Sequence, residues 1–169
     1  MQPSGAEAEF LMPTKPRYRE RSFIPVQNRP PIKVRQHQAT SEDRTTSFVF
    51  GYHDHFETPT GKRVANTLDG AVGGSVVRVS GKLLAAPKKI VYGKYPGREF
   101  SYVFAYEGKI HQAAGRVFLV GKRQYFLQAL FEKDKFDEEI AERFLNSFRI
   151  VKPDLPPRPP FPPKKSTDQ

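Results

Sequence analysis

The chain of 169 residues contains no cysteine and no tryptophan. Without cysteine there are no disulfide bonds, thiolate metal ligands or cysteine nucleophiles. The lack of cysteine is compatible with an oxidising or a reducing compartment. Long apolar runs are also missing, since no stretch approaches the ~20 residues that a helix needs to cross a bilayer. Residues 1–9 lack the basic region and apolar stretch of a secretory signal. We therefore leave the localisation unknown: cytoplasmic as the chain is written, or envelope or lumenal if a signal was removed.

Both ends of the chain are poor in apolar periodicity. Residues 1–21 carry three prolines, and residues 153–169 consist mainly of proline, lysine and small polar groups. Neither segment can bury enough apolar surface to offset the entropy lost on ordering. We therefore predict an extended N-terminal tail over residues 1–21, one folded domain over 22–152, and a proline-rich C-terminal tail over 153–169. A domain of this size is sufficient for a single core.

Alternating apolar residues in the first part of this domain predict short strands. These strands span 21–26, 32–40 and 45–52. Thr58-Pro59 is typical of a helix start, because a hydroxyl cap precedes a proline at the first helical position. Apolar residues then recur at helical spacing and predict an amphipathic stripe of Val64, Leu68, either Ala71 or Val72, and Val76. Three glycines either weaken this helix by about 1 kcal/mol each or let it approach the sheet closely: Gly70, Gly73 and Gly74.

The second part of the domain predicts longer strands joined by tight turns. Strands are expected over 81–91, 99–106, 110–120 and 124–131, with turns at Tyr95-Pro96-Gly97, Glu107-Gly108-Lys109 and Gly121-Lys122. Two short hairpin loops in succession require adjacent antiparallel strands. A final helix is expected with Asp134 as its cap and a buried stripe of Ile140, Phe144, Leu145 and Phe148. The predicted fold is α+β, an antiparallel sheet of about six to seven strands sandwiched with two main helices.

Three strings in the second part carry a resemblance. They are GKYPGRE at 93–99, GRVFLVGKRQY at 115–125 and RFLNSF at 143–148. They resemble the C-terminal half of uncharacterised bacterial proteins of the planctomycete type, which are similar to PsbP-like domains and to DcrB-like envelope proteins. The resemblance covers residues 68–150, and over residues 23–52 only the strand pattern agrees. It implies a PsbP-like α-β sandwich that serves as an accessory subunit or interaction domain, a group in which few members catalyse a reaction.

Few residues carry recognisable chemistry. His53-Asp54-His55 offers two imidazoles and a carboxylate, but adjacent residues on a strand point in different directions, so an exposed polar loop is the simpler interpretation. His53, His55 and the single His111 are therefore only weak metal candidates. Gly61-Lys62 lacks the upstream glycine of a phosphate-binding loop, and no serine lies in a Gly-x-Ser-x-Gly elbow. We predict no catalytic residue, no cofactor and no enzyme activity.

The formal net charge is +10, and much of it gathers in residues 82–123, which we call the basic sector. Glu99 and Glu107 oppose these basic residues: Lys82, Lys88, Lys89, Lys94, Arg98, Lys109, Arg116, Lys122 and Arg123. Such a sector attracts polyanions, acidic proteins or anionic membranes, although a basic soluble surface is the simpler interpretation. Alternating aromatics in the same region could stack nucleic-acid bases, but a sheet core explains them more simply: Phe100, Tyr102, Phe104 and Tyr106.

The prolines of the C-terminal tail favour an extended polyproline II spacer, and Pro159, Pro162 and Lys164 match a generic SH3-ligand spacing. We expect partner contacts from this tail and the basic sector: Lys88, Lys89, Lys94, Arg98, Lys122, Arg123, Arg158 and Phe161. The sequence thus predicts a non-enzymatic interaction domain, an accessory subunit or binding module that docks onto a protein complex with its tails and basic rim. The alternative is a polyanion-binding module, for nucleic acid or an anionic membrane surface, that uses the basic sector.

Overall fold

The computed structural model describes residues 7–23 and 30–151. Within these ranges the chain forms ten strands, two α-helices and one short 3-10 helix, in the following order: β1 (Ala8–Glu9), β2 (Arg17–Phe23), β3 (Ile32–Thr40), β4 (Thr46–Asp54), α1 (Lys62–Val77), β5 (Lys82–Leu83), β6 (Lys88–Tyr92), β7 (Tyr95–Tyr106), β8 (Lys109–Val120), β9 (Arg123–Glu132), η1 (Lys133–Lys135), α2 (Glu138–Asn146) and β10 (Arg149–Ile150). No helix among the described residues is long and apolar enough to cross a membrane.

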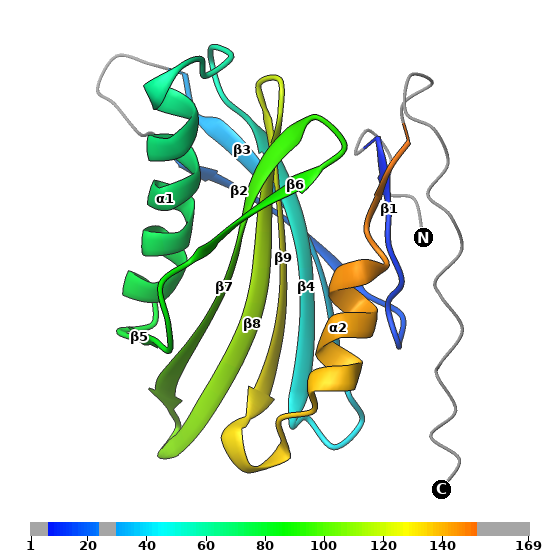
Figure 1. Ribbon diagram of the computed structural model, residues 1–169. Helices are drawn as coiled ribbons and strands as arrows, with labels where there is room; N and C mark the ends of the chain where they lie inside the picture. The colour runs from blue at the N-terminus through cyan, green and yellow to red at the C-terminus, as the bar shows by residue number, and fades with distance from the viewer. Residues whose placement is uncertain (1–6, 24–29, 152–169) are drawn as a thin grey trace, which may run out of the picture.

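One large antiparallel sheet forms the centre of the molecule, with one helix on each side of it (Figure 1). Seven of its eight strands follow the order β2-β3-β4-β9-β8-β7-β5, and the eighth, β6, also pairs with β7. On one face α1 packs against β7 and β8, and on the other α2 packs against β8 and β9. β1 and β10 form a separate two-stranded sheet beside α2. The predicted α+β fold is confirmed, with eight strands in the main sheet where about six to seven were expected.

The larger half of the core lies between the sheet and α2. Alternate residues of β4 and β9 point to this side and are almost fully buried: Phe48, Phe50, Tyr52, Tyr125, Leu127, Ala129 and Phe131. Phe144 and Leu145 of α2 cover them, and the ring of Phe148 stacks on Phe118 with 5.4 Å between centroids. Since burying one such side chain contributes about 2–3 kcal/mol, this aromatic layer is the main source of stability on this side.

Both helices begin three residues later than the sequence predicts. The cap of α2 is Asp137 and not Asp134, and its side chain accepts a hydrogen bond from the backbone N of Ile140 at 2.9 Å. Asp134 lies instead in η1, and Ile140 is 46% exposed and outside the buried stripe. The first helix follows Gly61, which has φ of 55° and makes no side-chain cap, so Thr58-Pro59 precedes the helix without starting it.

The smaller half of the core lies between the sheet and α1. Leu68, Val72 and Val76 pack against the aromatic side chains of β7, which confirms the predicted helical stripe. Phe100, Tyr102 and Phe104 are buried there, whereas Tyr106, at the end of β7, is 58% exposed. The glycines of α1 do not bring the helix close to the sheet, because a Cβ at each would meet nothing within 4 Å: Gly70, Gly73 and Gly74.

The described part of the predicted N-terminal tail belongs to the fold, which corrects the expectation for residues 7–21. Ala8 and Phe10 are 0% and 1% exposed, and the ring of Phe10 stacks on Phe50 with 4.0 Å between centroids. β1 pairs with β10, so the two ends of the domain are held together. The alternation of Ala8 and Phe10 is too short to be recognised in the sequence. These residues become ordered only through contacts with residues far along the chain. The C-terminal tail over 153–169 lies outside the described residues.

Tight turns join the long strands, and one of them differs from the prediction. Tyr95-Pro96-Gly97 is the start of β7, and the turn before it is Gly93-Lys94, where Gly93 has φ of 59°. Gly97 is needed for a different reason, since a Cβ there would lie 2.5 Å from the carbonyl oxygen of Val117. The expected strand over 81–91 is divided into β5 and β6. The turns at Gly108 and Gly121 are confirmed, with φ of 75° and 61°.

Candidate functional site

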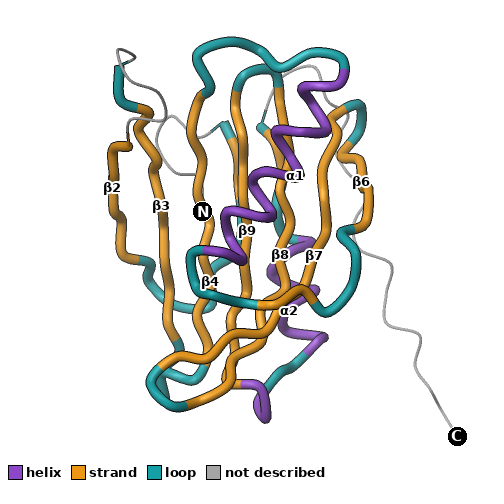
Figure 2. The backbone as a smooth tube through the Cα atoms, turned by 90° about the vertical axis from the view of Figure 1, so that its left-hand side faces the viewer, coloured by secondary structure: helices purple, strands orange, loops and turns teal. Residues whose placement is uncertain are grey.

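α1 covers only part of its face of the sheet. It packs against β7 and β8, while β2 and β3 lie to one side with no helix in front of them (Figure 2). Strand register places side chains of four strands on this side of the sheet, which we call the open face: Arg17, Arg19, Arg21 and Phe23 of β2, Val34, Gln36 and Gln38 of β3, Val49, Gly51 and His53 of β4, and Gln124, Phe126 and Gln128 of β9. Its uncovered part is formed by β2 and β3, because the β4 residues and Gln124 are buried.

Two rows of directly opposed residues cross the open face. They are Arg17-Gln38-Val49-Gln128 and Arg19-Gln36-Gly51-Phe126, and Arg21 stands opposite Val34 in the next row. The open face therefore has guanidinium groups and the ring of Phe23 at its outer edge, side-chain amides behind them, and the ring of Phe126 toward the middle of the sheet. This sequence of groups offers hydrogen-bond donors and positive charge to an incoming ligand.

The arginines of the open face have no acidic neighbours on it. Arg17, Arg19 and Arg21 are exposed, and none forms an ion pair with a described residue. The one acid of β2, Glu20, points to the opposite face and pairs there with Lys33 at 3.5 Å and with Arg35 at 3.2 Å. Three positive charges at alternate positions of one strand create a local field that attracts anions.

The amides toward the middle of the sheet are held by neighbours. Gln128 Oε1 lies 3.5 Å from the hydroxyl of Tyr102, and burial raises the pKa of Tyr102 to about 12, which keeps that hydroxyl protonated. Gln124 is 6% exposed, with its Oε1 at 3.1 Å from Nε2 of His55. Gln36 and Gln38 are half-buried and make no side-chain hydrogen bond to a described residue. These two amides lie directly behind the arginines and are available to a ligand.

The structure brings two of the three predicted metal candidates together. The rings of His53 and His55 meet edge to face with 4.8 Å between centroids, and Nδ1 of His53 is buried without a hydrogen-bond partner. Burial, with a smaller contribution from neighbouring His55, lowers the pKa of His53 to about 4, so the ring is neutral at neutral pH. Over residues 7–23 and 30–151 no three His, Cys, Asp or Glu side chains gather closely enough to hold a metal.

The third candidate lies at the other end of the sheet. His111 is paired with Glu132, and His53 is paired with Gln124, so eight residues of β9 separate the two positions, about 26 Å along a strand. The ring of His111 stacks on Phe104 with 5.2 Å between centroids, and its Nδ1 is buried without a partner. The three histidines therefore do not form one site.

The predicted partner-binding residues separate into two groups. Lys88, Lys89, Lys94 and Lys122 are exposed, in β6 and in two turns. Arg98 and Arg123 are not part of a free basic rim. Arg98 is 6% exposed and donates to Asp69 Oδ1 at 2.7 Å, and Arg123 donates to both carboxylate oxygens of Asp54 at 2.7 and 2.9 Å. Arg158 and Phe161 lie outside the described residues.

The basic sector loses two further cations to internal pairs. Arg116 binds Glu99 at 2.7 Å and Glu142 at 3.1 Å, and Lys109 binds Glu132 at 2.6 Å. The arginines of β2 are not among the predicted site residues, because the sequence places residues 1–21 in a predicted tail. The available signal was the alternation of arginine in the string RYRERSF, which places all three on one side of a strand.

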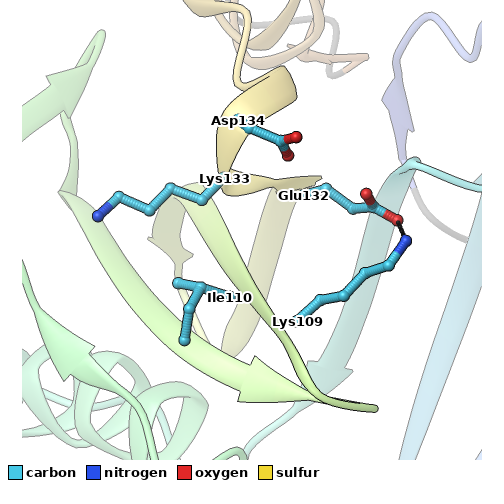
Figure 3. A pocket seen from close by; sticks show the side chains of 5 residues that line it. All are labelled: Lys109, Ile110, Glu132, Lys133 and Asp134. Carbon is cyan, nitrogen blue, oxygen red and sulfur yellow. Dashed lines mark hydrogen bonds and ion pairs between the residues drawn. The ribbon is translucent and has the colours of Figure 1, made fainter.

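A shallow depression of about 620 Å³ lies at the end of the sheet near His111 (Figure 3). It is lined by Lys109, Ile110, Glu132, Lys133 and Asp134, and Lys109 and Glu132 are already paired with each other. Its charges are mixed, and its residues come from the ends of β8 and β9 and from η1, so it offers no set of converging groups for a small ligand.

No protein-family model and no curated protein matches the chain. Solved structures that are similar to it include the following two. LpqN, involved in cell envelope biogenesis of Mycobacterium tuberculosis, has 12% sequence identity and a TM-score of 0.47 over 83% of this chain and 81% of that chain. A protein of Bacteroides thetaiotaomicron VPI-5482 has 10% identity and a TM-score of 0.45 over 79% of this chain and 42% of that chain. Both similarities concern the α+β fold at low identity and say nothing about function.

Proposed function

We propose that the protein is a non-enzymatic interaction domain that binds an acidic protein partner through its open face, as an accessory subunit or binding module of a larger complex. One observation carries this proposal: Arg17, Arg19 and Arg21 lie side by side on an uncovered part of the sheet that holds no carboxylate. Alternate residues of a strand lie about 7 Å apart, so the three guanidinium groups form a regular row. Carboxylates on an extended partner can match that row.

The open face suits this role better than the basic sector does. Arginine presents a planar fork that matches a carboxylate, and it sheds water more readily than lysine. In the basic sector the three arginines are already bound to carboxylates of this chain, and the cations without an ion pair to a described residue are these lysines: Lys82, Lys88, Lys89, Lys94 and Lys122. They are the site of the alternative function, a module that binds nucleic acid or an anionic membrane surface.

A protein partner also fits the aromatic side chains better than a nucleic acid does. Sheets that bind single-stranded nucleic acid expose aromatic rings on which the bases stack. In this molecule Phe100 and Tyr102 are buried beneath α1, and the ring of Phe126 lies against Gly51. The open face thus has charge and amides for recognition, and the exposed ring it offers for stacking is that of Phe23, which is 44% exposed at the edge of the sheet.

The finer family assignment, to PsbP-like and DcrB-like domains, is part of this proposal. It is supported by the three sequence strings, two of which lie in the central hairpin strands and one in α2 and its end. Accessory and interaction roles are common among those domains. They agree with this sheet, in which some charged side chains form ion pairs within the fold and the others remain exposed and can bind a partner.

Matched charge reversals test the proposal. Labelled poly-L-glutamate and a single-stranded oligothymidylate are titrated with the full chain, and binding is followed by fluorescence anisotropy. Replacing Arg17, Arg19 and Arg21 by glutamate should weaken poly-L-glutamate binding by at least about tenfold. Replacing Lys88, Lys89 and Lys94 by glutamate changes the net charge equally on another part of the surface and should have a much smaller effect.

Three outcomes would overturn the proposal. The chain could fail to bind poly-L-glutamate at all. The lysine triple variant could lose binding while the arginine triple variant keeps it, which would place the site in the basic sector. The chain could bind oligothymidylate more tightly than poly-L-glutamate at the same salt concentration, which would favour the nucleic-acid alternative.

A further inference from the structure

We infer that β2 is a docking strand: an extended acidic segment of the partner pairs with its free edge and adds a strand to the sheet. This inference rests on the proposed function and specifies how the partner binds.

β2 is an uninterrupted edge strand. Its seven residues, Arg17–Phe23, are all exposed, and each pairs with β3. It is the terminal strand of the sheet order, so its second edge has no strand beside it among the described residues. The peptide groups along that edge are therefore available for hydrogen bonds with another chain, which is the basis of strand addition in peptide-binding domains.

The opposite end of the sheet is built differently. Two short strands, β5 of two residues and β6 of five, share β7 as their partner there. Short and interrupted edge strands are a common protection against pairing with other chains. β2 has no such interruption, and its sequence contains neither proline nor glycine. Of the two ends of the sheet, the one formed by β2 is thus the better template for a partner strand.

The two sides of β2 specify the partner's sequence pattern. On the open face a paired strand would place every second side chain opposite Arg17, Arg19 and Arg21, and opposite charges directly across a sheet stabilise the pairing. On the other side stand Tyr18, Glu20 and Ser22, where Tyr18 is 54% exposed and Glu20 is paired with Lys33 and Arg35. The expected segment therefore has acidic residues at alternate positions, separated by residues that are not acidic.

The same charges disfavour a second copy of the chain as the occupant. In a symmetric antiparallel pair of β2 strands, directly opposed residues come from the same face. A pair centred on Arg19 would place Arg17 opposite Arg21 of the other copy, so that like charges meet across the junction. The arginines thus disfavour self-pairing in this register and favour an acidic strand at the edge.

The test compares peptides of equal composition. One alternates glutamate with threonine, and the other groups the same glutamates in one block. The full chain should bind the alternating peptide about fivefold or more tightly than the block peptide. N-methylation of alternate backbone amides should abolish binding when it modifies the edge that faces β2 and spare it when it modifies the other edge. Hydrogen exchange of β2 amides should slow on binding.

The controls separate this inference from the function on which it rests. The Arg17→Glu, Arg19→Glu, Arg21→Glu variant should bind neither peptide, while the Lys88→Glu, Lys89→Glu, Lys94→Glu variant should still prefer the alternating one. Equal binding of both peptides, or binding that survives N-methylation of either edge, would overturn the docking strand. If that binding still required the three arginines, the proposed function would stand. Failure of the unmodified chain to bind either peptide would overturn the docking strand and count against the proposed function.

Discussion

The phenyl ring of Phe126 lies directly over the backbone of Gly51, its cross-strand partner in the β4–β9 pair. A Cβ at position 51 would come within 2.1 Å of Cζ of Phe126. Two more glycines meet a phenylalanine in the same way across β7 and β8, in the pairs Gly115–Phe100 and Gly97–Phe118. In each pair the ring covers a strand position that has no side chain of its own.

Replacing Gly51 by alanine should therefore destabilise the protein. The new methyl group must displace the ring of Phe126, and overpacking of this kind costs about 1–3 kcal/mol. Chemical denaturation of the variant measures this loss. In the Gly51→Ala, Phe126→Leu double variant the clash is relieved, so the two changes should cost less together than the sum of their separate effects.

Gly70→Ala is the matched control for that substitution. Gly70 lies in α1, and a Cβ there would meet nothing within 4 Å. Alanine at this helix position should raise the free energy of unfolding by about 0.5–1 kcal/mol. If both glycine substitutions changed stability in the same direction, the contact between Gly51 and Phe126 would not be the cause.

Arg116 joins α2 to the sheet and should be sensitive to substitution. Its guanidinium group donates to Glu99 at 2.7 Å, to Asn146 at 2.7 Å and to Glu142 at 3.1 Å, and its side chain is 13% exposed. Arg116→Met should lower the free energy of unfolding by about 2–4 kcal/mol, because the shielded carboxylate and amide groups lose their common partner.

An exposed pair serves as the control for Arg116. Arg63 and Glu57 lie 3.4 Å apart, and their side chains are 67% and 61% exposed. Arg63→Met should change stability by less than about 0.5 kcal/mol, since an exposed ion pair contributes little. Equal losses for the two methionine variants in urea denaturation would show that burial of the Arg116 network is unimportant.

His53 should make stability depend on pH. Burial, with the nearby His55, lowers its pKa in the folded state to about 4, while in the unfolded chain it returns to an ordinary value of about 6.5. Between these values the unfolded chain binds the extra proton, so stability rises with pH across this window. The contribution is complete above pH 6.5 and is lost as the pH falls toward 4, with a total of about 3 kcal/mol.

Denaturation of the His53→Gln variant at several pH values between 4 and 7 measures this contribution. Glutamine does not titrate, so the variant should lose less stability than the original chain as the pH falls. Asp54 and His37 also titrate with shifted pKa values and remain in both proteins, so only the difference between the two slopes is informative. Parallel slopes would contradict the assignment to His53.

Removing residues 153–169 tests the docking role that the sequence predicts for the C-terminal tail. The described fold ends with β10 and Val151, so the shortened chain should keep its thermal midpoint. If the tail, with Arg158 and Phe161, straps the domain onto a complex, affinity purification should recover a stable complex with the full chain and not with the shortened one. An unaccompanied monomer in both cases would contradict the strapping role.

Several features of the fold could be read from local patterns. Alternation in β7 indicated the buried aromatic row of Phe100, Tyr102 and Phe104, and helical spacing indicated Leu68, Val72 and Val76 in the stripe of α1. Glycine in the turns at Gly108 and Gly121 marked the hairpins, because each adopts a positive φ. These features depend on period and backbone preference, which are properties of neighbouring residues.

The candidate site depended on contacts between residues far apart in the chain. Arg98 and Lys89 look alike in the sequence, yet Arg98 is buried against Asp69 of α1 and Lys89 is exposed on β6. The sequence alone determined that the chain is basic, rich in alternating strands and without cysteine chemistry. Only the tertiary structure decided that Phe10 joins the core and that the arginines of β2 face an uncovered part of the sheet. Burial and exposure arise from the pairing of distant strands, and no local pattern specifies which strand remains at the edge.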